Sequence, residues 1–381
     1  MDRRLIALCA GNAVIGTGTM VVPGMLPVLT RGLGVDLQAG GRLIAAFGLT
    51  VCLLTPVLAG WLSRIDQRRL LTALMLLFLA GHAIAGLVDD YAAVMATRIA
   101  VAISAGLFTS QAAGTTRLLV PPERQGAAVG FVFLGWSIAA VAGMPLGAWI
   151  AATLGWRAGF FMVAAASAVT MVWVWRVLPA GLRVPAIDAA AWRAVARHGR
   201  LLAVVAVTAI HSSAQFTIFS YYTPILVERT AVSATGVTAM LALFGLAGIA
   251  GNVVAIRTLD RAGSARVVAT SIGLMTAGQV WMAIGAFDTV SMIGGSVLWG
   301  LGCFAANSAQ QARLLMLAPA LAPVSVALNS SAIYLGQAVG AEAGGHILTD
   351  WGFDALAWAS LPTFAIALGL SVMARRRVSA G

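Results

Sequence analysis

The chain is poor in charged residues, above all in acids, and it contains no lysine. Only 10% of its 381 residues are charged, while 60% are hydrophobic and the mean hydropathy is +0.93. A soluble globular domain carries roughly 25% charged residues. This composition therefore excludes a soluble domain and predicts an integral membrane protein. The net charge of +11 comes from arginines scattered along the chain, so we expect no nucleic-acid partner.

Cysteine is scarce as well. The three cysteines lie in apolar runs, with neither a disulfide framework nor the spacing of metal ligands. The sequence also has no phosphate-binding loop and no plausible nucleophile–base pair. We therefore expect no enzymatic activity, no ATP-driven pumping, no metal and no cofactor. The first apolar run, 5–29, is too long for the core of a signal peptide and is interpreted as a retained first span.

Long apolar runs recur along the chain and predict twelve membrane-spanning helices. If both termini are cytoplasmic, all but five of the 24 arginines fall on the inner side or in inner loops, as the positive-inside rule requires. The polar stretch 179–200 is interpreted as a cytoplasmic linker between an N-terminal six-helix bundle, 1–178, and a C-terminal one, 201–381. The predicted spans are 5–28, 39–62, 70–88, 92–115, 127–152, 158–176, 201–227, 235–257, 267–286, 291–313, 325–347 and 355–374.

The two halves repeat each other at a constant shift of 197 residues, the separation of Pro27 and Pro224. The shift serves spans one, two, five and six of each half without a gap. A parallel repeat of two six-helix halves is a transporter architecture, with the substrate site between the halves. The matched segments include Phe47-Gly48-Leu49 with Phe244-Gly245-Leu246, Gly143 with Gly340, Gly147 with Gly344, and Gly155 with Gly352.

The fifth span contains Gly143, Pro145 and Gly147, a combination that a soluble helix rarely tolerates. With the following Leu-Gly-Trp-Arg at 154–157, it resembles the fifth-span signature of the major facilitator superfamily, in its twelve-span drug:proton antiporter branch. The resemblance implies an all-α fold of two pseudo-symmetric six-helix bundles, and it associates the motif with export. We expect these glycines and their repeats to lie where helices of opposite halves approach closely, or where a helix bends.

The loop after the second span resembles the superfamily's loop motif, which clamps the cytoplasmic gate through salt bridges and helix-end charges. Its positions here are Gly60, Ser63, Arg64, Asp66, Arg68 and Arg69. Ser63 stands where the family has an acid, and Asp66 where it has a glycine. The second-half copy, which begins with Asp260 and Arg261, is nearer to the pattern. The alternative is that these arginines only anchor the topology.

Two charged residues fall inside predicted spans. Arg98 lies in the fourth span, where a guanidinium needs a wet cavity or a partner; the family places an arginine there that is linked to proton coupling. Glu342, in the outer part of the eleventh span, is the only acid within a span and suits a proton carrier. The alternatives are an arginine that snorkels outward and a carboxylate that is hydrated or ion-paired.

Uncharged polar and aromatic residues gather in spans one, seven, ten and eleven. At helical spacing they suit a pocket for an uncharged or amphipathic organic molecule, although any of them can instead bond helix to helix. These candidates for the substrate and proton pathway are Asn12, His211, Gln215, Tyr221, Tyr222, Asn307, Gln310, Tyr334 and Gln337.

The sequence therefore predicts a multi-pass, monomeric secondary transporter of the bacterial inner membrane. We expect it to export a small organic compound, of the drug, sugar or nucleoside type, by proton-driven antiport. We also expect such export to contribute to drug resistance. One alternative is uptake of a small metabolite by proton symport, because related exporters often carry a first-span acid near the position of Thr19 that is missing here. Another is a transport-dead membrane sensor, which the lack of an appended soluble domain argues against.

Overall fold

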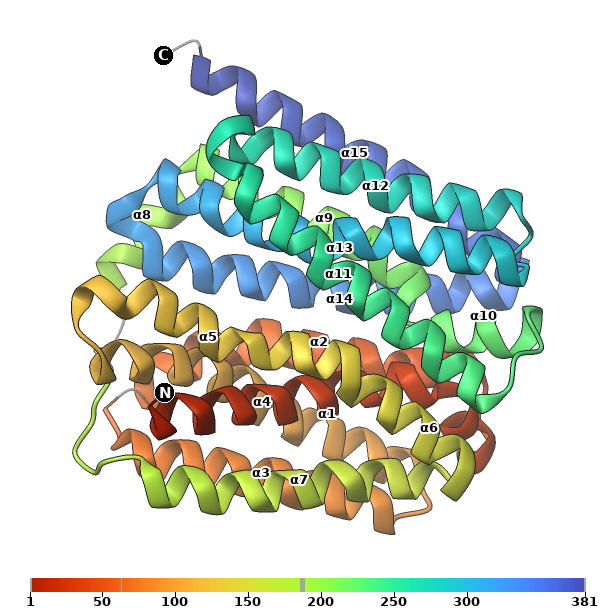
Figure 1. The fold of residues 1–381 in the computed structure, drawn as a ribbon, viewed down its shortest axis with the longest axis horizontal. Coiled ribbons are helices and arrows are strands. Elements are labelled where there is room, and N and C mark those ends of the chain that lie inside the picture. The colour runs from red at the N-terminus through yellow and green to blue at the C-terminus, as the bar shows by residue number, and fades with distance from the viewer. Residues whose placement is uncertain (1, 63, 186–188, 380–381) are drawn as a thin grey trace. The chain divides into compact units, whose positions relative to one another are not determined.

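A computed structural model describes residues 2–62, 64–185 and 189–379, and these are almost entirely helical (Figure 1). Eleven helical stretches among them are long and apolar enough to cross a membrane. A further 30-residue helix, α14 (Ala322–Trp351), completes the twelve predicted spans. The predicted all-α class and twelve-helix architecture are thereby confirmed.

The helices follow the chain in the order of the predicted spans. The first six spans are α1 (Arg3–Leu33), α2 (Leu37–Leu62), α3 (Gln67–Leu87), α4 (Tyr91–Leu119), a composite of η1 (Pro122–Arg124), α5 (Gln125–Ile138), the π-helical η2 (Ala139–Gly143) and α6 (Met144–Leu154), and α7 (Trp156–Val177). The rest are α8 (Ala189–Arg197), which does not span, α9 (Gly199–Phe219) with α10 (Tyr222–Arg229), α11 (Ala234–Ala262), α12 (Ser264–Ile284), α13 (Thr289–Leu317), η3 (Pro319–Leu321), α14, and α15 (Phe353–Ser379).

The helix bounds repeat at the predicted shift of 197 residues. The bounds 67–87 of α3 become 264–284 in α12, and the bounds 122–124 of η1 become 319–321 in η3. The turns repeat too: Gly155 and Gly352 both have positive φ, 91° and 78°, a conformation that glycine adopts without steric cost. The two halves therefore share turn chemistry as well as hydropathy.

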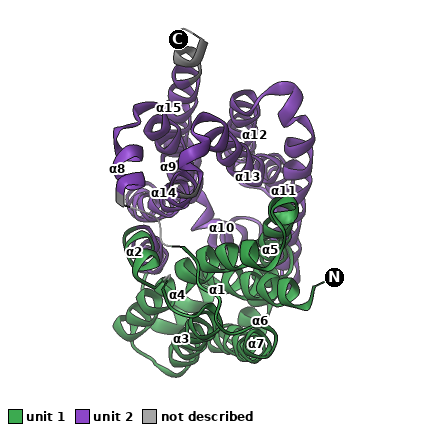
Figure 2. Ribbon diagram, turned by 90° about the vertical axis from the view of Figure 1, so that its left-hand side faces the viewer, with its two compact units in different colours: residues 1–36, 53–186 green, residues 37–52, 187–381 purple. Residues whose placement is uncertain are grey.

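Contacts group the chain into two compact units, residues 1–36 with 53–186 and residues 37–52 with 187–381 (Figure 2). One continuous helix, α2, is divided between them, its first half belonging to the second unit. The division falls next to Pro56, which lies inside the helix and cannot donate to the carbonyl of residue 52. The predicted boundaries at residues 178 and 201 stay a prediction.

The glycines of the fifth and eleventh spans pack within their own halves. A Cβ at Gly147 would lie 3.0 Å from a methyl group of Val21 in α1, and one at Gly340 would lie 3.0 Å from the Cβ of Phe216 in α9. Their nearest neighbours lie in their own halves, and the predicted approach between opposite halves stays a prediction. Small residues at every fourth position let α14 lie directly on α9. Gly143 ends the π-helical η2, an irregularity at which helices often kink, and the predicted bend stays a prediction.

The linker is anchored at both described ends. After α7 it stays with the first unit, where the backbone N–H of Gln67 donates to the carbonyl of Leu182 at 2.9 Å. In the second unit, α8 packs Val195 into a cluster with Leu201 and Leu314. The arginines of α8 are exposed, so this amphipathic helix presents its apolar side to the bundle.

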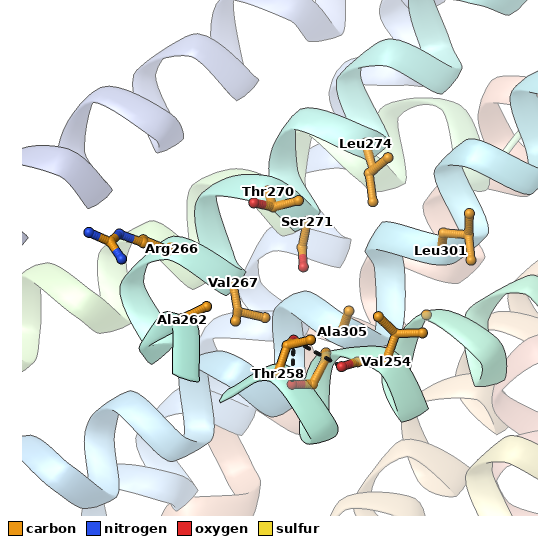
Figure 3. Close-up of a pocket in the computed structure, with 12 residues that line it drawn as sticks. Val254, Thr258, Ala262, Arg266, Val267, Thr270, Ser271, Leu274, Leu301 and Ala305 are labelled. Carbon is orange, nitrogen blue, oxygen red and sulfur yellow. Dashed lines mark hydrogen bonds between the residues drawn. The ribbon is translucent and has the colours of Figure 1, made fainter. Parts of the chain in front are cut away.

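A groove lies between α11 and α12 in the second unit, with α13 as its floor (Figure 3). The two helices are joined by the single residue Gly263, whose φ is 80°. Each packs along α13 far more than along the other. They therefore diverge from the turn and leave the surface of α13 uncovered between them.

Candidate functional site

The first half of α2 packs closely on α14 within the second unit. At Gly48 an added Cβ would lie 2.7 Å from the carbonyl oxygen of Tyr334, so only glycine permits this approach. The side-chain amide of Gln337 donates to the carbonyl of Ile44 at 3.3 Å. The predicted pathway residues Tyr334 and Gln337 thus lie against α2.

A tyrosine at the end of α9 completes this contact. The hydroxyl of Tyr221 donates to the carbonyl of Ala341 at 2.7 Å, and both residues are fully buried. Gly41 of α2 lies directly over that hydroxyl, with no room for a Cβ. Three helices, α2, α9 and α14, therefore meet here through backbone groups and one phenol.

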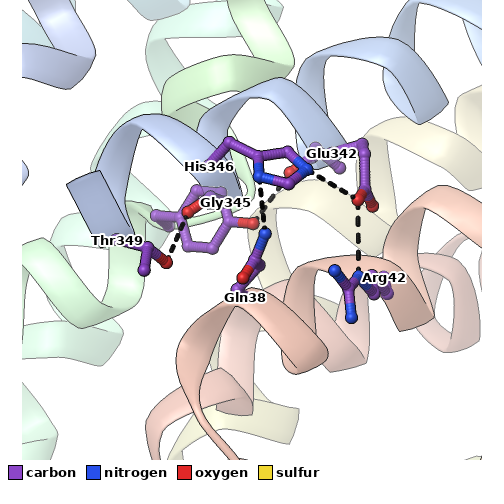
Figure 4. Close-up of polar contacts among 8 residues, drawn as sticks. Gln38, Arg42, Glu342, Gly345, His346 and Thr349 are labelled. Atoms are coloured by element: carbon purple, nitrogen blue, oxygen red, sulfur yellow. Dashed lines mark hydrogen bonds and ion pairs between the residues drawn. The ribbon is translucent and has the colours of Figure 1, made fainter.

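Glu342 lies at the edge of this contact, in a cluster of four polar side chains (Figure 4). Its Oε1 is 3.4 Å from Nε of Arg42 and 3.3 Å from Nε2 of His346. The other ring nitrogen of His346 is 2.9 Å from the side-chain nitrogen of Gln38. Each helix contributes two residues four positions apart, the spacing that places side chains on one face.

The hydrogen bonds define the proton positions in this cluster. The amide nitrogen of Gln38 can only donate, so Nδ1 of a neutral His346 accepts and its proton sits on Nε2, facing Glu342. Glu342 thus faces the guanidinium of Arg42 and the imidazole of His346. The side chains of Glu342, Arg42 and His346 are 39%, 50% and 59% exposed, so the cluster lies at the surface of the described helices rather than in their packed core.

The sequence singled out Glu342 but missed its three partners. The structure matches the alternative interpretation of that residue as an ion-paired group rather than an isolated buried acid. The signal that could have identified the partners is the pair of four-residue spacings, Gln38 with Arg42 and Glu342 with His346. The role of Glu342 as proton carrier stays a prediction.

Arg98 and Asn12 lie in the first unit. Arg98 is 1% exposed, and its Nη1 donates to the carbonyl of Gly18 in α1 at 3.1 Å. Asn12 is fully buried and donates to the carbonyl of Val132 at 3.1 Å, which joins α1 to α5. The predicted link between Arg98 and proton coupling stays a prediction.

A buried polar network joins α9, α13 and α14. The amide of Gln310 donates to the carbonyl of Val204 at 3.0 Å and to the hydroxyl of Thr208 at 3.1 Å. Thr208 in turn donates to the side-chain oxygen of Asn329 at 2.6 Å. The remaining amide atoms, Oε1 of Gln310 and Nδ2 of Asn329, have no hydrogen-bond partner among the described residues.

Further uncommitted polar groups lie in the same three-helix region. His211 is 1% exposed, and neither ring nitrogen has a described partner. The Oδ1 of Asn307 also lacks one, whereas Gln215 donates to the sulfur of Cys303 at 2.9 Å. Several of the predicted candidates in α9, α13 and α14 thus carry polar atoms that have no hydrogen-bond partner among the described residues.

Tyr222 belongs to an aromatic block rather than to this polar set. Its ring centroid lies 5.7 Å from that of Trp299 and 6.2 Å from that of Phe244. Its hydroxyl is 2.5 Å from the hydroxyl of Ser296. Tyr222 and Trp299 are fully buried, so the block fastens α10 to α11 and α13. A part in the substrate pathway stays a prediction.

The loop motif acts locally on α3 and the start of the linker. Asp66 caps α3 by accepting from the backbone N–H of Arg69 at 3.0 Å, and it also accepts from that of Gly181. The guanidinium of Arg68 lies over the ring of Trp175, 4.2 Å from its centroid. Of the other positions, Arg64 is exposed, Gly60 is partly exposed, and Ser63 lies outside the described residues.

In the second-half copy, Asp260 and Arg261 are exposed at the end of α11. Pro145 and Gly147 are buried in α6. The gating role of the loop motif and of the fifth-span motif stays a prediction.

Comparison with known proteins identifies the family. Residues 8–320 match the model of the Major Facilitator Superfamily, which covers most of the chain. The chain belongs to the major facilitator superfamily. This confirms the resemblance stated above, and it makes the protein a multi-pass membrane transporter by family.

Relatives within the superfamily align over nearly the full length. The inner membrane transport protein YdhP of Escherichia coli is 30% identical over 373 residues, which cover 97% of this chain and 94% of that protein. A probable sugar efflux transporter of Mannheimia succiniciproducens is 27% identical over 357 residues, or 92% and 88% of the two chains.

A solved structure shows the same fold. A bacterial homologue of the human lysosomal transporter Spinster, in an inward-facing and unoccupied conformation, superposes with a TM-score of 0.79 at 15% identity. The alignment covers 98% of this chain and 96% of that one. At this identity the likeness concerns the fold alone.

Proposed function

We propose that this transporter exports a small, uncharged organic compound across the bacterial inner membrane in exchange for protons, by alternating access. The relatives support export, because two of them are described as probable sugar efflux transporters. The uncommitted groups on α9, α13 and α14 support an uncharged, hydrogen-bonding substrate, since they are amides and an imidazole. A sugar or nucleoside can pair with such amide and imidazole groups, whereas an ion needs charged partners.

The observation that carries the proposal is the position of Glu342 between Arg42 and His346. When Glu342 is ionised, it holds the first half of α2 on α14 through Arg42. A proton on the carboxylate removes the negative charge that attracts Arg42 and leaves Glu342 a weaker, uncharged acceptor for the Nε2–H of His346. Proton binding therefore weakens the attachment of α2 to α14.

This coupling links protonation to exposure of the outer side. Glu342 lies in the outer part of its span by the predicted topology, so protons of the periplasm reach it. The protonated state then favours separation of α2 from α14, and substrate leaves to the periplasm in that state. The state that opens to the inside therefore binds substrate, and the state that opens to the outside binds a proton.

The test uses inside-out membrane vesicles that hold an acidic lumen and a fluorescent dye quenched by that acidity. Sugars, nucleosides and chloramphenicol are added one at a time. An antiporter releases lumenal protons when its substrate enters, so fluorescence recovers. We expect recovery with at least one compound in the wild type and none with Glu342→Gln, while binding of that compound persists. Glu123→Gln, an inner-side carboxylate change, is the matched control.

Three outcomes contradict parts of the proposal. If fluorescence recovers with Glu342→Gln as fully as with the wild type, a group other than Glu342 carries the proton. If the compound accumulates in right-side-out vesicles with an inward proton gradient, the protein takes it up by proton symport rather than exporting it. Absence of flux for every compound in both vesicle types would favour the sensor.

A further inference from the structure

The groove between α11 and α12 is apolar along most of its length. It encloses about 160 Å³, and its walls include Val254 and Thr258 of α11, Val267 and Leu274 of α12, and Leu301 of α13. Val254 is 58% exposed, so the groove opens outward rather than into the packed core. In a membrane-spanning bundle, an open apolar surface at this depth is in contact with lipid chains.

The groove narrows toward the turn at Gly263, and its charge is concentrated there. Arg266 lies at this end, next to Ala262, while Leu274 and Leu301 lie at the other end (Figure 3). A second recess continues from the same place and contains Arg261 and Asp260 as well as Arg266. Arginine thus outnumbers acid at the mouth, and none of these three residues forms a described ion pair.

The backbone at the turn adds to this positive end. Gly263 caps α12 without a side-chain hydrogen bond, and the first turn of α12 holds no acid. The first N–H groups of a helix are partly positive. The shape and the charge therefore match one molecule: an apolar chain along the groove and an anionic group at Arg266.

We propose that this groove binds one anionic phospholipid, with an acyl chain between α11 and α12 and its phosphate at Arg266 and Arg261. A free phosphate would use the charged mouth but not the apolar length of the groove. The site shares no residue with the Glu342 cluster, so the proposal is independent of the transported compound. Phospholipid binding here braces the turn whose residues form the second copy of the loop motif.

Native mass spectrometry of the purified full chain, titrated with phosphatidylglycerol or phosphatidylcholine, tests the site. We expect tighter binding of phosphatidylglycerol. Arg266→Gln should weaken that binding about fivefold, the effect of one basic residue near a lipid headgroup, and Arg266→Gln with Arg261→Gln about 25-fold if the two contributions add. Thr258→Phe, which places a ring in the groove, should weaken the binding of both lipids.

Arg197→Gln is the matched control, because Arg197 is an exposed arginine of α8 outside the groove. Equal binding of the two lipids would overturn the proposal. So would an Arg266→Gln protein that binds phosphatidylglycerol like the wild type, or an Arg197→Gln protein that loses as much affinity. Arg266 is exposed, so its substitution leaves the packing of the bundle intact, and a melting measurement in detergent checks that all four variants are folded.

Discussion

The contact between α2 and α14 can be tested by adding one methyl group at Gly48. The Cβ of an alanine there would lie 2.7 Å from the carbonyl oxygen of Tyr334 and 3.2 Å from the backbone nitrogen of Ala338. Both neighbours are backbone atoms and cannot swing aside, so α2 must move away from α14. Overpacking of this kind costs about 1–3 kcal/mol.

If α2 and α14 separate during transport, this cost raises the free energy of the packed state, in which the two helices touch, and leaves that of the separated state unchanged. A difference of 1–3 kcal/mol changes the ratio of packed to separated molecules by roughly 5- to 150-fold. Gly48→Ala should therefore raise the population of the separated state by about that factor. Alanine also favours a helix over glycine by about 1 kcal/mol, so the folded bundle itself should lose little stability.

Cysteine labelling measures the separated population. In a background without the native cysteines, Ala341→Cys provides a fully buried reporter in α14. The carbonyl of Ala341 would lie 3.3 Å from a Cβ at Gly41 of α2, seven residues before the altered glycine. We expect an impermeant maleimide, applied from the outside, to label it at least five times faster when Gly48→Ala is present. The lower end of the calculated range sets that threshold.

Two glycine variants separate this effect from general destabilisation. Gly273→Ala, in α12, meets nothing within 4 Å and should leave labelling unchanged. Gly340→Ala presses on α9 instead, with Thr217 N only 2.9 Å from the new Cβ, and should lower the melting temperature without selective labelling. If Gly48→Ala labels no faster than Gly273→Ala, the reasoning is refuted.

Four further predictions concern positions elsewhere. Gly147→Leu should lower both the melting temperature and transport, as followed by size-exclusion chromatography after heating, because even its Cβ would lie 3.0 Å from Val21. Asp66→Ala removes a helix cap and should cost about 1 kcal/mol, with faster proteolysis of the linker. Thr208→Val leaves buried amides unpaired and should cost about 1–3 kcal/mol in denaturant melts. The backbone N–H of Ser291 donates to Asp288 and lowers the pKa of that carboxyl. The ionised carboxylate should therefore stabilise the fold above the ordinary carboxyl pKa, and this stabilisation should be lost as pH falls through the lowered pKa. Asp288→Ala should flatten that part of the curve of stability against pH.

The number of spans, and their bounds to within several residues, could be predicted from the sequence, because the spans of both halves must match the thickness of the same bilayer and end in the same turn residues. The shift that relates Pro27 to Pro224 therefore reappears in the bounds of α3 and α12. Hydropathy also sufficed to single out Glu342, since a lone acid in an apolar run is conspicuous.

The partners of Glu342 could not be predicted in the same way. Arg42 lies 300 residues away in the sequence, and hydropathy says nothing about which helices meet. The aromatic residues show the same limit: Tyr222 is uncharged, bulky and polar at its tip, which suits either a pocket or a packed block, and only its contact with Trp299 distinguishes the two.

The proline in α2 has a consequence for how force passes along that helix. Because Pro56 leaves the carbonyl of Cys52 without its helical donor, the helix is least resistant to bending where its two parts join different units. The outer part can leave α14 while the inner part stays packed in the first unit. The Arg42–Glu342 pair lies about three to four helical turns from Cys52 and Pro56, so a movement at that pair can be taken up by a bend there before it reaches the Asp66 loop. The outer face can therefore open while the inner face stays closed.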